Sequence, residues 1–224
     1  MVRCRSKVSQ KMLAALAFCM LWFVTGGVSA SDENIDAALL MPGNDDIEVG
    51  GYAKTNWYAL TSIVDHWELV STTLSIARSD IDPDVVSIES DKPNALVFIR
   101  GSSLREGPVD SASVDSGRAA RTLEDAGLKS LSIAFRGSVY TLGLKSGRVV
   151  YSSEGRHSIL NAKQDAGMIT RVSVLWAGDI NRDGTLDLLV DLKTEAHSRI
   201  CMMASLASGN MELVRPIACR FYGG

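Results

Sequence analysis

The sequence lacks the short motifs by which common enzyme active sites are recognised. It has no G-x-S-x-G nucleophile turn, no H-E-x-x-H metal motif, no phosphate-binding P-loop and no Rossmann glycine pattern. Its only histidines, His66, His157 and His197, are scattered, and each is expected to lie on the surface or at a strand edge rather than to act as a base. We therefore expect the protein not to be an enzyme.

A segment long enough to cross a membrane is also absent. The one candidate, residues 12–24, is shorter than the roughly 20 apolar residues that a spanning helix needs. It follows a basic segment and precedes Val28-Ser29-Ala30, a small-residue cleavage sequence. These features predict a cleaved signal peptide over 1–30. The mature chain would begin at Ser31, would not be inserted in the membrane and would be periplasmic or secreted.

The mature chain has no excess of positive charge. Residues 1–30 carry four basic residues and no acidic one, so their removal changes the formal net charge from −3 to −7. A chain with this balance is a poor partner for nucleic acid or for an anionic membrane surface. We therefore expect neither as a partner.

Cysteine is scarce in the mature chain. Only Cys201 and Cys219 remain, and in an oxidising compartment two cysteines most simply form one disulfide, with free thiols as the alternative. A two-residue turn at Gly209-Asn210 would place Cys201 opposite Ala218 instead. A three-residue turn or a one-residue bulge would bring the cysteines together, and Pro216, which donates no backbone hydrogen bond, is the natural place for a bulge.

Apolar and polar residues alternate through most of the chain from residue 52 onward, which is typical of β-strands. Glycine-containing turns separate neighbouring segments. The pattern predicts an all-β domain of antiparallel hairpins that form a sandwich or a barrel-like fold. Only 35–41 and 118–124 are helical candidates. The expected strands are 56–62, 67–76, 85–88, 95–99, 128–135, 138–144, 149–153, 158–160, 171–176, 186–192, 200–206 and 211–221.

Composition suggests how the mature chain is divided. The acidic segment 31–51 contains turn-forming glycines and a proline and is expected to be a mobile leader. The segment 106–127 is polar, rich in small residues and long for a connection without secondary structure. It is expected to be a loop or linker between an amino-terminal β sub-domain, 52–105, and a carboxy-terminal one, 128–224. It is either a binding loop or a solvated connection.

The most specific chemical pattern is the segment Asp179-Ile180-Asn181-Arg182-Asp183-Gly184-Thr185-Leu186-Asp187. Oxygen-bearing side chains stand at loop positions 1, 3, 5 and 9, the glycine at position 6 permits a sharp turn, and the carbonyl at position 7 is a further ligand. Calcium takes about six to eight oxygen ligands, so this spacing predicts a calcium loop. The expected ligands are Asp179, Asn181, Asp183, Thr185 and Asp187.

The loop is not an EF-hand, because position 12 is Val190 instead of glutamate. Alternating or continuous apolar residues at 172–176 and 186–192 predict a strand on either side. A metal-free loop is the alternative, since Asp and Asn also hydrogen-bond their own backbone in turns. The nonapeptide occurs once, so a repeated calcium β-helix or a propeller is not expected.

The pattern Asp179-x-Asn181-x-Asp183-Gly184-x-x-Asp187 resembles the calcium segment of FG-GAP or VCBS-type repeats, which occur in integrin propellers and in many exported bacterial proteins. Together with 95–101 and 106–109, the wider stretch 175–192 is similar to a little-characterised family of exported bacterial proteins that carry one such segment. The resemblance brings no settled activity. Asn181 stands where Asp is commoner and Arg182 where a small residue is usual, so weak calcium binding is expected.

Two further patterns have more than one interpretation. Asp65 and Glu68 flank His66 and could perform acid–base chemistry on a sugar, although such residues near a hairpin turn are usually only solvated. The aromatic residues Trp57, Tyr58 and Trp67 could stack on a carbohydrate, but packing across one face of a hairpin is the commoner reason for them.

These observations leave three hypotheses. The favoured one is an exported, calcium-stabilised, non-enzymatic module that binds a protein or glycan through the 106–127 segment or the Trp57/Trp67 face. The second is a periplasmic inhibitor or immunity-type protein that blocks an enzyme. The third is a hydrolase that uses the metal or the carboxylates of Asp65 and Glu68, which would require a pocket joining the metal to a base.

Overall fold

The computed structural model contains only β-strands among the residues that it describes. These are residues 38–45, 56–78, 85–115, 121–124, 127, 129–161, 167–205 and 212–223. The chain divides into two units, 1–34 and 35–224, and every described residue belongs to the second. The all-β prediction is confirmed. The predicted signal peptide and most of the predicted leader lie outside the described residues.

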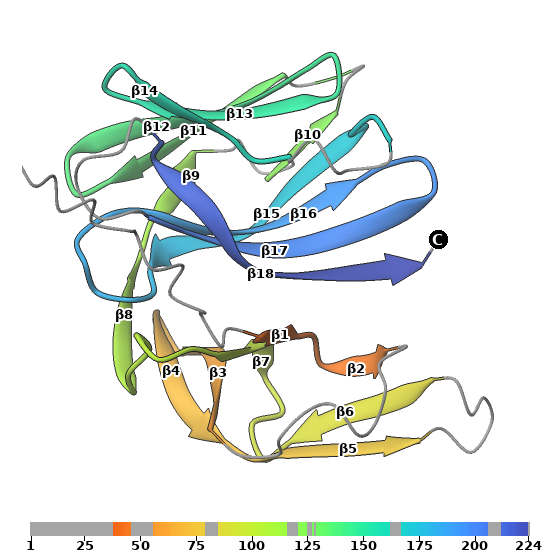
Figure 1. Cartoon of the computed structure of the whole chain (residues 1–224). Coiled ribbons are helices and arrows are strands. Elements are labelled where there is room, and N and C mark those ends of the chain that lie inside the picture. The colour runs from red at the N-terminus through yellow and green to blue at the C-terminus, as the bar shows by residue number, and fades with distance from the viewer. Residues whose placement is uncertain are drawn as a thin grey trace, which may run out of the picture. The chain divides into compact units, whose positions relative to one another are not determined.

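The largest sheet has ten antiparallel strands in the order β1-β7-β3-β4-β8-β15-β16-β17-β18, with β10 also paired to β15. Its two edge strands, β1 and β18, contact each other, so the sheet nearly closes on itself like a barrel (Figure 1). This is the barrel-like form of the predicted fold. The bounds are β1 Ala38–Leu40, β3 Trp57–Ile63, β4 His66–Thr72, β7 Ala95–Arg100, β8 Gly107–Ser111, β10 Thr122–Glu124, β15 Arg171–Asp179, β16 Asp187–Lys193, β17 His197–Ser205 and β18 Val214–Gly223.

Two smaller sheets cover the outside of this barrel-like sheet. A five-stranded sheet, in the order β14-β13-β12-β11-β9, lies over the β15–β18 side, and a three-stranded sheet, in the order β2-β6-β5, lies beyond β3 and β7 (Figure 1). No helix long and apolar enough to span a membrane occurs among the described residues. The bounds are β2 Gly43–Asp45, β5 Leu74–Arg78, β6 Val86–Ser90, β9 Ser113–Asp115, β11 Ser130–Phe135, β12 Ser138–Lys145, β13 Arg148–Ser153 and β14 Arg156–Ile159.

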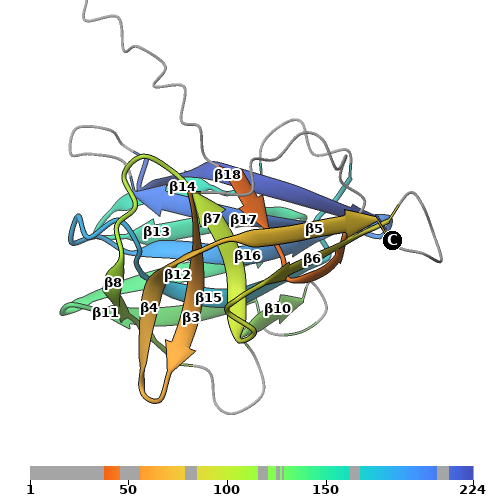
Figure 2. The ribbon, with the colours of Figure 1, turned by 90° about the horizontal axis from the view of Figure 1, so that it is seen from below.

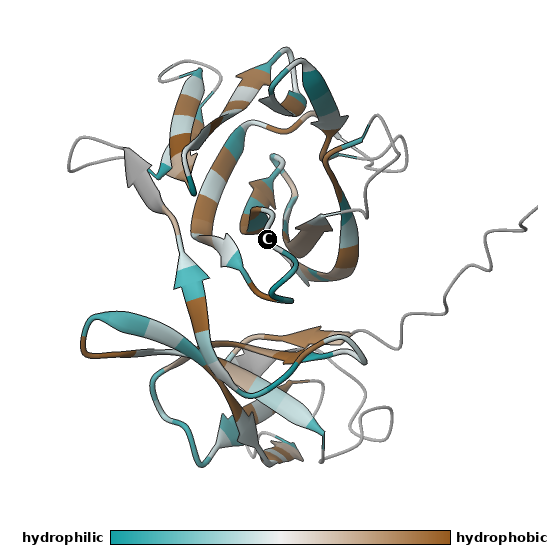
Figure 3. Ribbon diagram, turned by 90° about the vertical axis from the view of Figure 1, so that its left-hand side faces the viewer, coloured by the Kyte–Doolittle hydropathy of each residue, from teal (hydrophilic) through white to brown (hydrophobic). Residues whose placement is uncertain are grey.

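Hydrophilic and hydrophobic residues alternate along the strands (Figure 3), and the buried apolar residues of the described part of the chain form three cores. Successive side chains of a strand point to opposite faces, so one strand can serve two cores. In β16, Leu188 and Val190 pack under the five-stranded sheet, while Leu189 packs inside the barrel-like sheet. In β7, Val97 lies inside and Phe98 packs under the three-stranded sheet. These strands are apolar on both faces because both faces are buried.

Strand β8 joins the two halves of the ten-stranded sheet. It pairs with β4 through Gly107, Pro108 and Val109, and with β15 through Asp110 and Ser111. The segment 106–127, expected to be a loop or linker, therefore contains three short strands, β8, β9 and β10. The division into sub-domains 52–105 and 128–224 does not describe this sheet, because one hydrogen-bonded sheet contains strands from both ranges.

The described parts of both helical candidates contain strands instead of helices. Within 35–41 the structure has β1, which pairs with the end of β7, and within 118–124 it has β10, which pairs with β15. The expected strand 67–76 is interrupted at Thr73, and its second part becomes β5 of the three-stranded sheet. In each case a pairing between distant segments overrides the local sequence preference.

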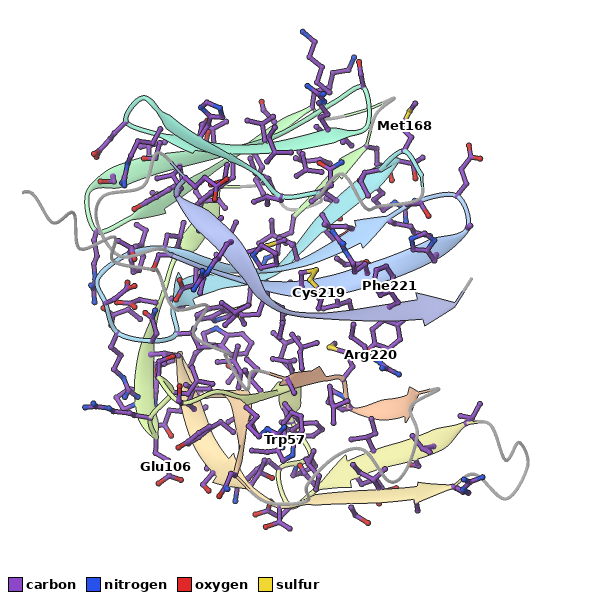
Figure 4. The ribbon with its side chains drawn as sticks, viewed as in Figure 1. Trp57, Glu106, Met168, Cys219, Arg220 and Phe221 are labelled. Atoms are coloured by element: carbon purple, nitrogen blue, oxygen red, sulfur yellow. A yellow bond between two sulfur atoms is a disulfide. The ribbon has the colours of Figure 1, made fainter. Side chains whose placement is uncertain are left out.

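The carboxy-terminal hairpin has the predicted change of register. Near the turn, Met203 pairs with Pro216; further on, Met202 pairs with Ala218 and Cys201 with Cys219. Ile217 is the extra residue of a bulge directly after Pro216, and this bulge brings the cysteines opposite each other. Their sulfur atoms form a disulfide, visible at Cys219 in Figure 4.

Candidate metal centre

The predicted calcium loop connects two buried strands. Strand β15 ends at Asp179 and β16 begins at Asp187, with Gly178 paired to Asp187. A bulge in β15 puts both Leu175 and Trp176 on the inner side of the barrel-like sheet. Because side chains alternate again beyond the bulge, Asp179 lies on the same face as Ala177, toward the five-stranded sheet.

Asp179 organises the loop through its carboxylate. Only 1% of its surface is exposed. Its Oδ1 accepts the backbone N–H of Asp183 at 2.9 Å, and its Oδ2 accepts that of Gly184 at 2.8 Å. These bonds fold the chain back onto the end of β15, as an Asx-type turn does. Gly184 has a φ of 91°, which favours glycine at this position.

The next three predicted ligands lie together at the exposed tip of the loop. The Asn181 side chain accepts the backbone N–H of Asp183 at 3.1 Å and donates to the Asp183 carboxylate at 3.0 Å. Asp183 also accepts the backbone N–H of Thr185 at 2.8 Å, the Thr185 hydroxyl and the Ser205 hydroxyl. Partial burial acts to raise the pKa of Asp183, but the hydrogen bonds from Ser205 and Thr185 outweigh it and lower that pKa.

Asp187, the last predicted ligand, lies at the base of the loop and is fully buried. Its Oδ2 accepts the backbone N–H of Ile180 and its Oδ1 accepts that of Ser205, both at 2.9 Å. Burial raises its pKa to about 7, against these hydrogen bonds, and the nearby charges of Asp183 and Asp179 add to the increase. Asp187 therefore closes the loop and also attaches it to the end of β17.

Two arginines complete the surroundings of the loop. Arg136, in the turn between β11 and β12, forms ion pairs with Asp110 and, at 3.1 Å, with Asp179. Arg182 does not pair with the loop carboxylates. Its guanidinium donates to the backbone carbonyls of Arg105, Glu106 and Pro108, at 2.9–3.2 Å, and so binds the segment that leads into β8.

The sequence patterns identified the loop but not the groups around it. Arg136 lies 43 residues before Asp179, and Ser205 lies 18 residues after Asp187. Neither stands at a spacing that any loop motif prescribes, and we find no sequence signal that would have identified them. The fold alone brings them to the loop.

The predicted calcium loop contains oxygen donors of the kind that calcium takes. Asp179, Asn181 and Asp183 supply side-chain oxygens and Thr185 supplies a carbonyl, all within one short loop, and a hard cation takes such ligands. Among the described residues, no group of three or more His, Cys, Asp or Glu side chains is arranged to hold a metal ion. A bound calcium would therefore draw on the amide of Asn181 and the Thr185 carbonyl together with the carboxylates.

The other candidate residues, Asp65, His66 and Glu68, belong to the β3–β4 hairpin and not to the 179–187 loop. His66 contacts Glu68 at 2.9 Å and Asp65 at 3.3 Å. Glu68 lines an open groove of about 540 Å³. The groove is lined by Thr61, Ser62, Ile63, Val64, Glu68, Val70, Lys92, Pro93 and Asn94, none of which belongs to the 179–187 loop. A metal-dependent hydrolase would require a pocket that joins the 179–187 loop to the carboxylates of Asp65 and Glu68. This groove does not join them.

The proposed aromatic platform is wrong. Trp57 is fully buried under the three-stranded sheet (Figure 4), whereas Tyr58 and Trp67 pack against the core inside the barrel-like sheet. Alternation along β3 places Trp57 and Tyr58 on opposite faces, so the three rings cannot form one stacking surface. The apolar surface that the hairpin does expose is at its tip, where Val64 is 98% exposed and Ile63 38%.

Comparison of the chain with models of known protein families, with curated proteins and with solved structures finds no match. The resemblance to FG-GAP or VCBS-type segments therefore stays a prediction based on the nonapeptide itself.

Proposed function

We propose that the protein is an exported, calcium-stabilised binding module without enzymatic activity. Its binding surface is the tip of the β3–β4 hairpin with the groove beside it. Val64 is the observation that carries this proposal. This branched apolar side chain is almost fully exposed and has a φ of 56°. Such a conformation costs a β-branched residue about 1–3 kcal/mol. Glycine would form the turn without that cost, so the side chain itself is what a partner would use.

The proposed occupant of the groove is an extended protein segment that carries apolar and basic side chains. Ile63, Val70 and Pro93 supply apolar surface, and the Glu68 carboxylate stands beside them. Asp65 adds a second acid at the tip. The two acids outweigh the single positive charge that His66 can carry between them, and Lys92 in the lining pairs with Asp91, so a basic side chain complements this end of the groove. A glycan is less well supported, because the burial of Trp57 removes the aromatic platform.

Site-specific photo-crosslinking in the exporting cell tests this surface. We expect a photo-reactive amino acid at position 64 to give an adduct with one partner protein. The same amino acid at Val139, which is 60% exposed on β12 of the five-stranded sheet, is the matched control and should not. Glu68→Lys should abolish the adduct at position 64, whereas Arg148→Glu should leave it unchanged.

Three results would count against the proposed surface. These are no adduct at position 64, equal adducts at positions 64 and 139, and an adduct that Glu68→Lys leaves unchanged. An adduct removed by glycosidases but not by proteases would identify a glycan instead.

An inhibitor of an enzyme is the second candidate, because the hairpin tip projects as an element entering a cleft would (Figure 2). In that case the partner is an enzyme that loses activity on binding.

Calcium is proposed to stabilise this module without taking part in chemistry. Asp179, Asn181, Asp183, the Thr185 carbonyl and Asp187 would hold the ion. The Asp187 carboxylate also holds the base of the loop through the backbone N–H groups of Ile180 and Ser205. At a free calcium concentration of about 100 times the Kd, binding would add about 2.7 kcal/mol to the free energy of unfolding. Thermal melts in calcium, magnesium and chelator test this: we expect calcium alone to raise the midpoint, and Asp183→Ala to remove the increase. Equal midpoints in all three solutions would contradict it.

Export is supported by the predicted signal peptide and by the Cys201–Cys219 pairing. A disulfide between strands is compatible with a periplasmic or secreted location. Fractionation of the producing cell tests this part independently of partner and metal: recovery of the chain in the cytoplasm with residues 1–30 still attached would contradict it.

A further inference from the structure

The turn between β11 and β12 places a guanidinium group against the metal loop. Arg136 lies in this turn with a φ of 46°. Its Nη1 is 3.1 Å from Oδ2 of Asp179, and its Nη2 contacts the Asp110 carboxylate. A Cβ atom added to Gly184 would be 3.2 Å from the same Nη1. The guanidinium therefore pairs with the first acid of the loop and lies beside its central glycine.

Burial explains why the loop needs this contact. Asp179 is almost completely removed from water, and an ionised carboxylate in such a place is costly unless a cation and hydrogen bonds compensate it. Arginine remains charged under all ordinary conditions.

We infer that Arg136 is a built-in counter-cation of the loop, which keeps the loop folded without metal and lowers its affinity for calcium. The second part rests on the proposed function. A divalent ion held by Asp179 would lie close to the guanidinium, and like charges at such distances repel strongly. Arg136 rather than Arg182 is then the arginine that weakens calcium binding, because the Arg182 guanidinium donates instead to backbone carbonyls just before and within β8.

Calorimetric titration of the purified protein with calcium chloride tests the inference. We expect Arg136→Gln to tighten calcium binding by about tenfold or more, the lower end of what Coulomb's law gives for one screened charge beside a divalent ion. Arg136→Lys keeps the charge and should bind calcium as the wild type does. Arg148→Gln is the matched control. Arg148 lies in β13, opposite the end of β12 that is farther from Arg136. Its substitution removes one charge from the same sheet and should leave the calcium affinity unchanged.

Melting in chelator supplies a second readout that does not depend on calcium. Arg136→Gln should lower the midpoint by roughly 3 °C or more, because Asp179 loses its counter-charge. In the Asp179→Asn background the same substitution should have a much smaller effect. Equal effects in both backgrounds would show that the two side chains are not coupled and would overturn the first part of the inference.

The calcium outcomes separate this inference from the proposed function. An Arg136→Gln affinity equal to or weaker than wild type overturns the second part while leaving calcium binding intact. If only the variant binds calcium, the inference holds and calcium is not the wild-type ligand. If neither binds, both the calcium proposal and the second part fail.

Discussion

At the scale of the residue, His66 has the surroundings that a titration can measure most directly. Its ring contacts the carboxylates of Glu68 and Asp65, and the Glu68 hydrogen bond makes the largest contribution to raising the pKa of His66 above 6.5. The folded protein then holds the His66 proton more tightly than the unfolded chain does. The contacts of protonated His66 with Glu68 and Asp65 therefore stabilise the protein at pH below 6.5. This contribution is lost as the pH rises through the folded-state pKa.

We therefore expect a nuclear magnetic resonance titration to place the His66 midpoint above 6.5. Glu68→Gln should lower this midpoint more than Asp65→Asn does, because Glu68 is the closer partner and the larger cause. An equal effect of the two substitutions, or none, would contradict the pairing.

At the scale of the element, the carboxy-terminal hairpin depends on one bulge and one disulfide. The bulge after Pro216 sets the register, and the disulfide closes a loop of 18 residues. In the chain-entropy model a closure of this size contributes about 3 kcal/mol. We expect reduction, or Cys201→Ala with Cys219→Ala, to lower stability by about that amount and to speed hydrogen exchange first in β18.

The neighbouring pair β16–β17 provides the comparison for that experiment. Its amide exchange should change little on reduction, because Cys201 is the only residue of this pair that the disulfide includes. Uniform acceleration across β16, β17 and β18 would argue against a local effect. Two free thiols in denatured, unreduced protein from its native compartment would show that the bridge does not form.

At the scale of the whole molecule, the two halves of the ten-stranded sheet meet where β8 pairs with β15. Gly178 lies at this junction, and a Cβ atom added there would be 2.2 Å from the backbone oxygen of Asp110 and 2.4 Å from the Trp176 ring. Neither a backbone group nor a buried ring can give way easily. Gly178→Ala should therefore cost about 3 kcal/mol or more by overpacking and should separate β8 from β15.

The matched substitution is Gly143→Ala in β12. A Cβ atom there would have only ordinary contacts, at 3.7 Å from the Lys129 oxygen and 3.9 Å from the Val150 oxygen. Its stability should stay within about 1 kcal/mol of wild type. Denaturant unfolding followed by tryptophan fluorescence distinguishes the two variants. If Gly178→Ala were tolerated as well as Gly143→Ala, the close packing at this junction would be refuted.

Much of the fold follows from patterns between near neighbours in the sequence. Alternation predicted most of the strands, because the side-chain period of a strand depends only on the local backbone. The shifted register of the last hairpin was predictable only once the two cysteines were expected to pair, and Pro216 then indicated where a bulge could produce the shift. The residues of the 179–187 loop were also predictable, since a short loop carries its own turn chemistry.

The tertiary structure decided whatever depends on residues far apart in the chain. Strand pairing across long separations made strands of 38–40 and of the segment 107–111, where composition favoured a helix and a loop. Burial of Trp57 depended on the three-stranded sheet above it. The sequence by itself determined an all-β chain with an acidic loop between two strands. Only the fold brought Arg136 and Ser205 to that loop, because no sequence spacing encodes a contact between segments this far apart in the chain.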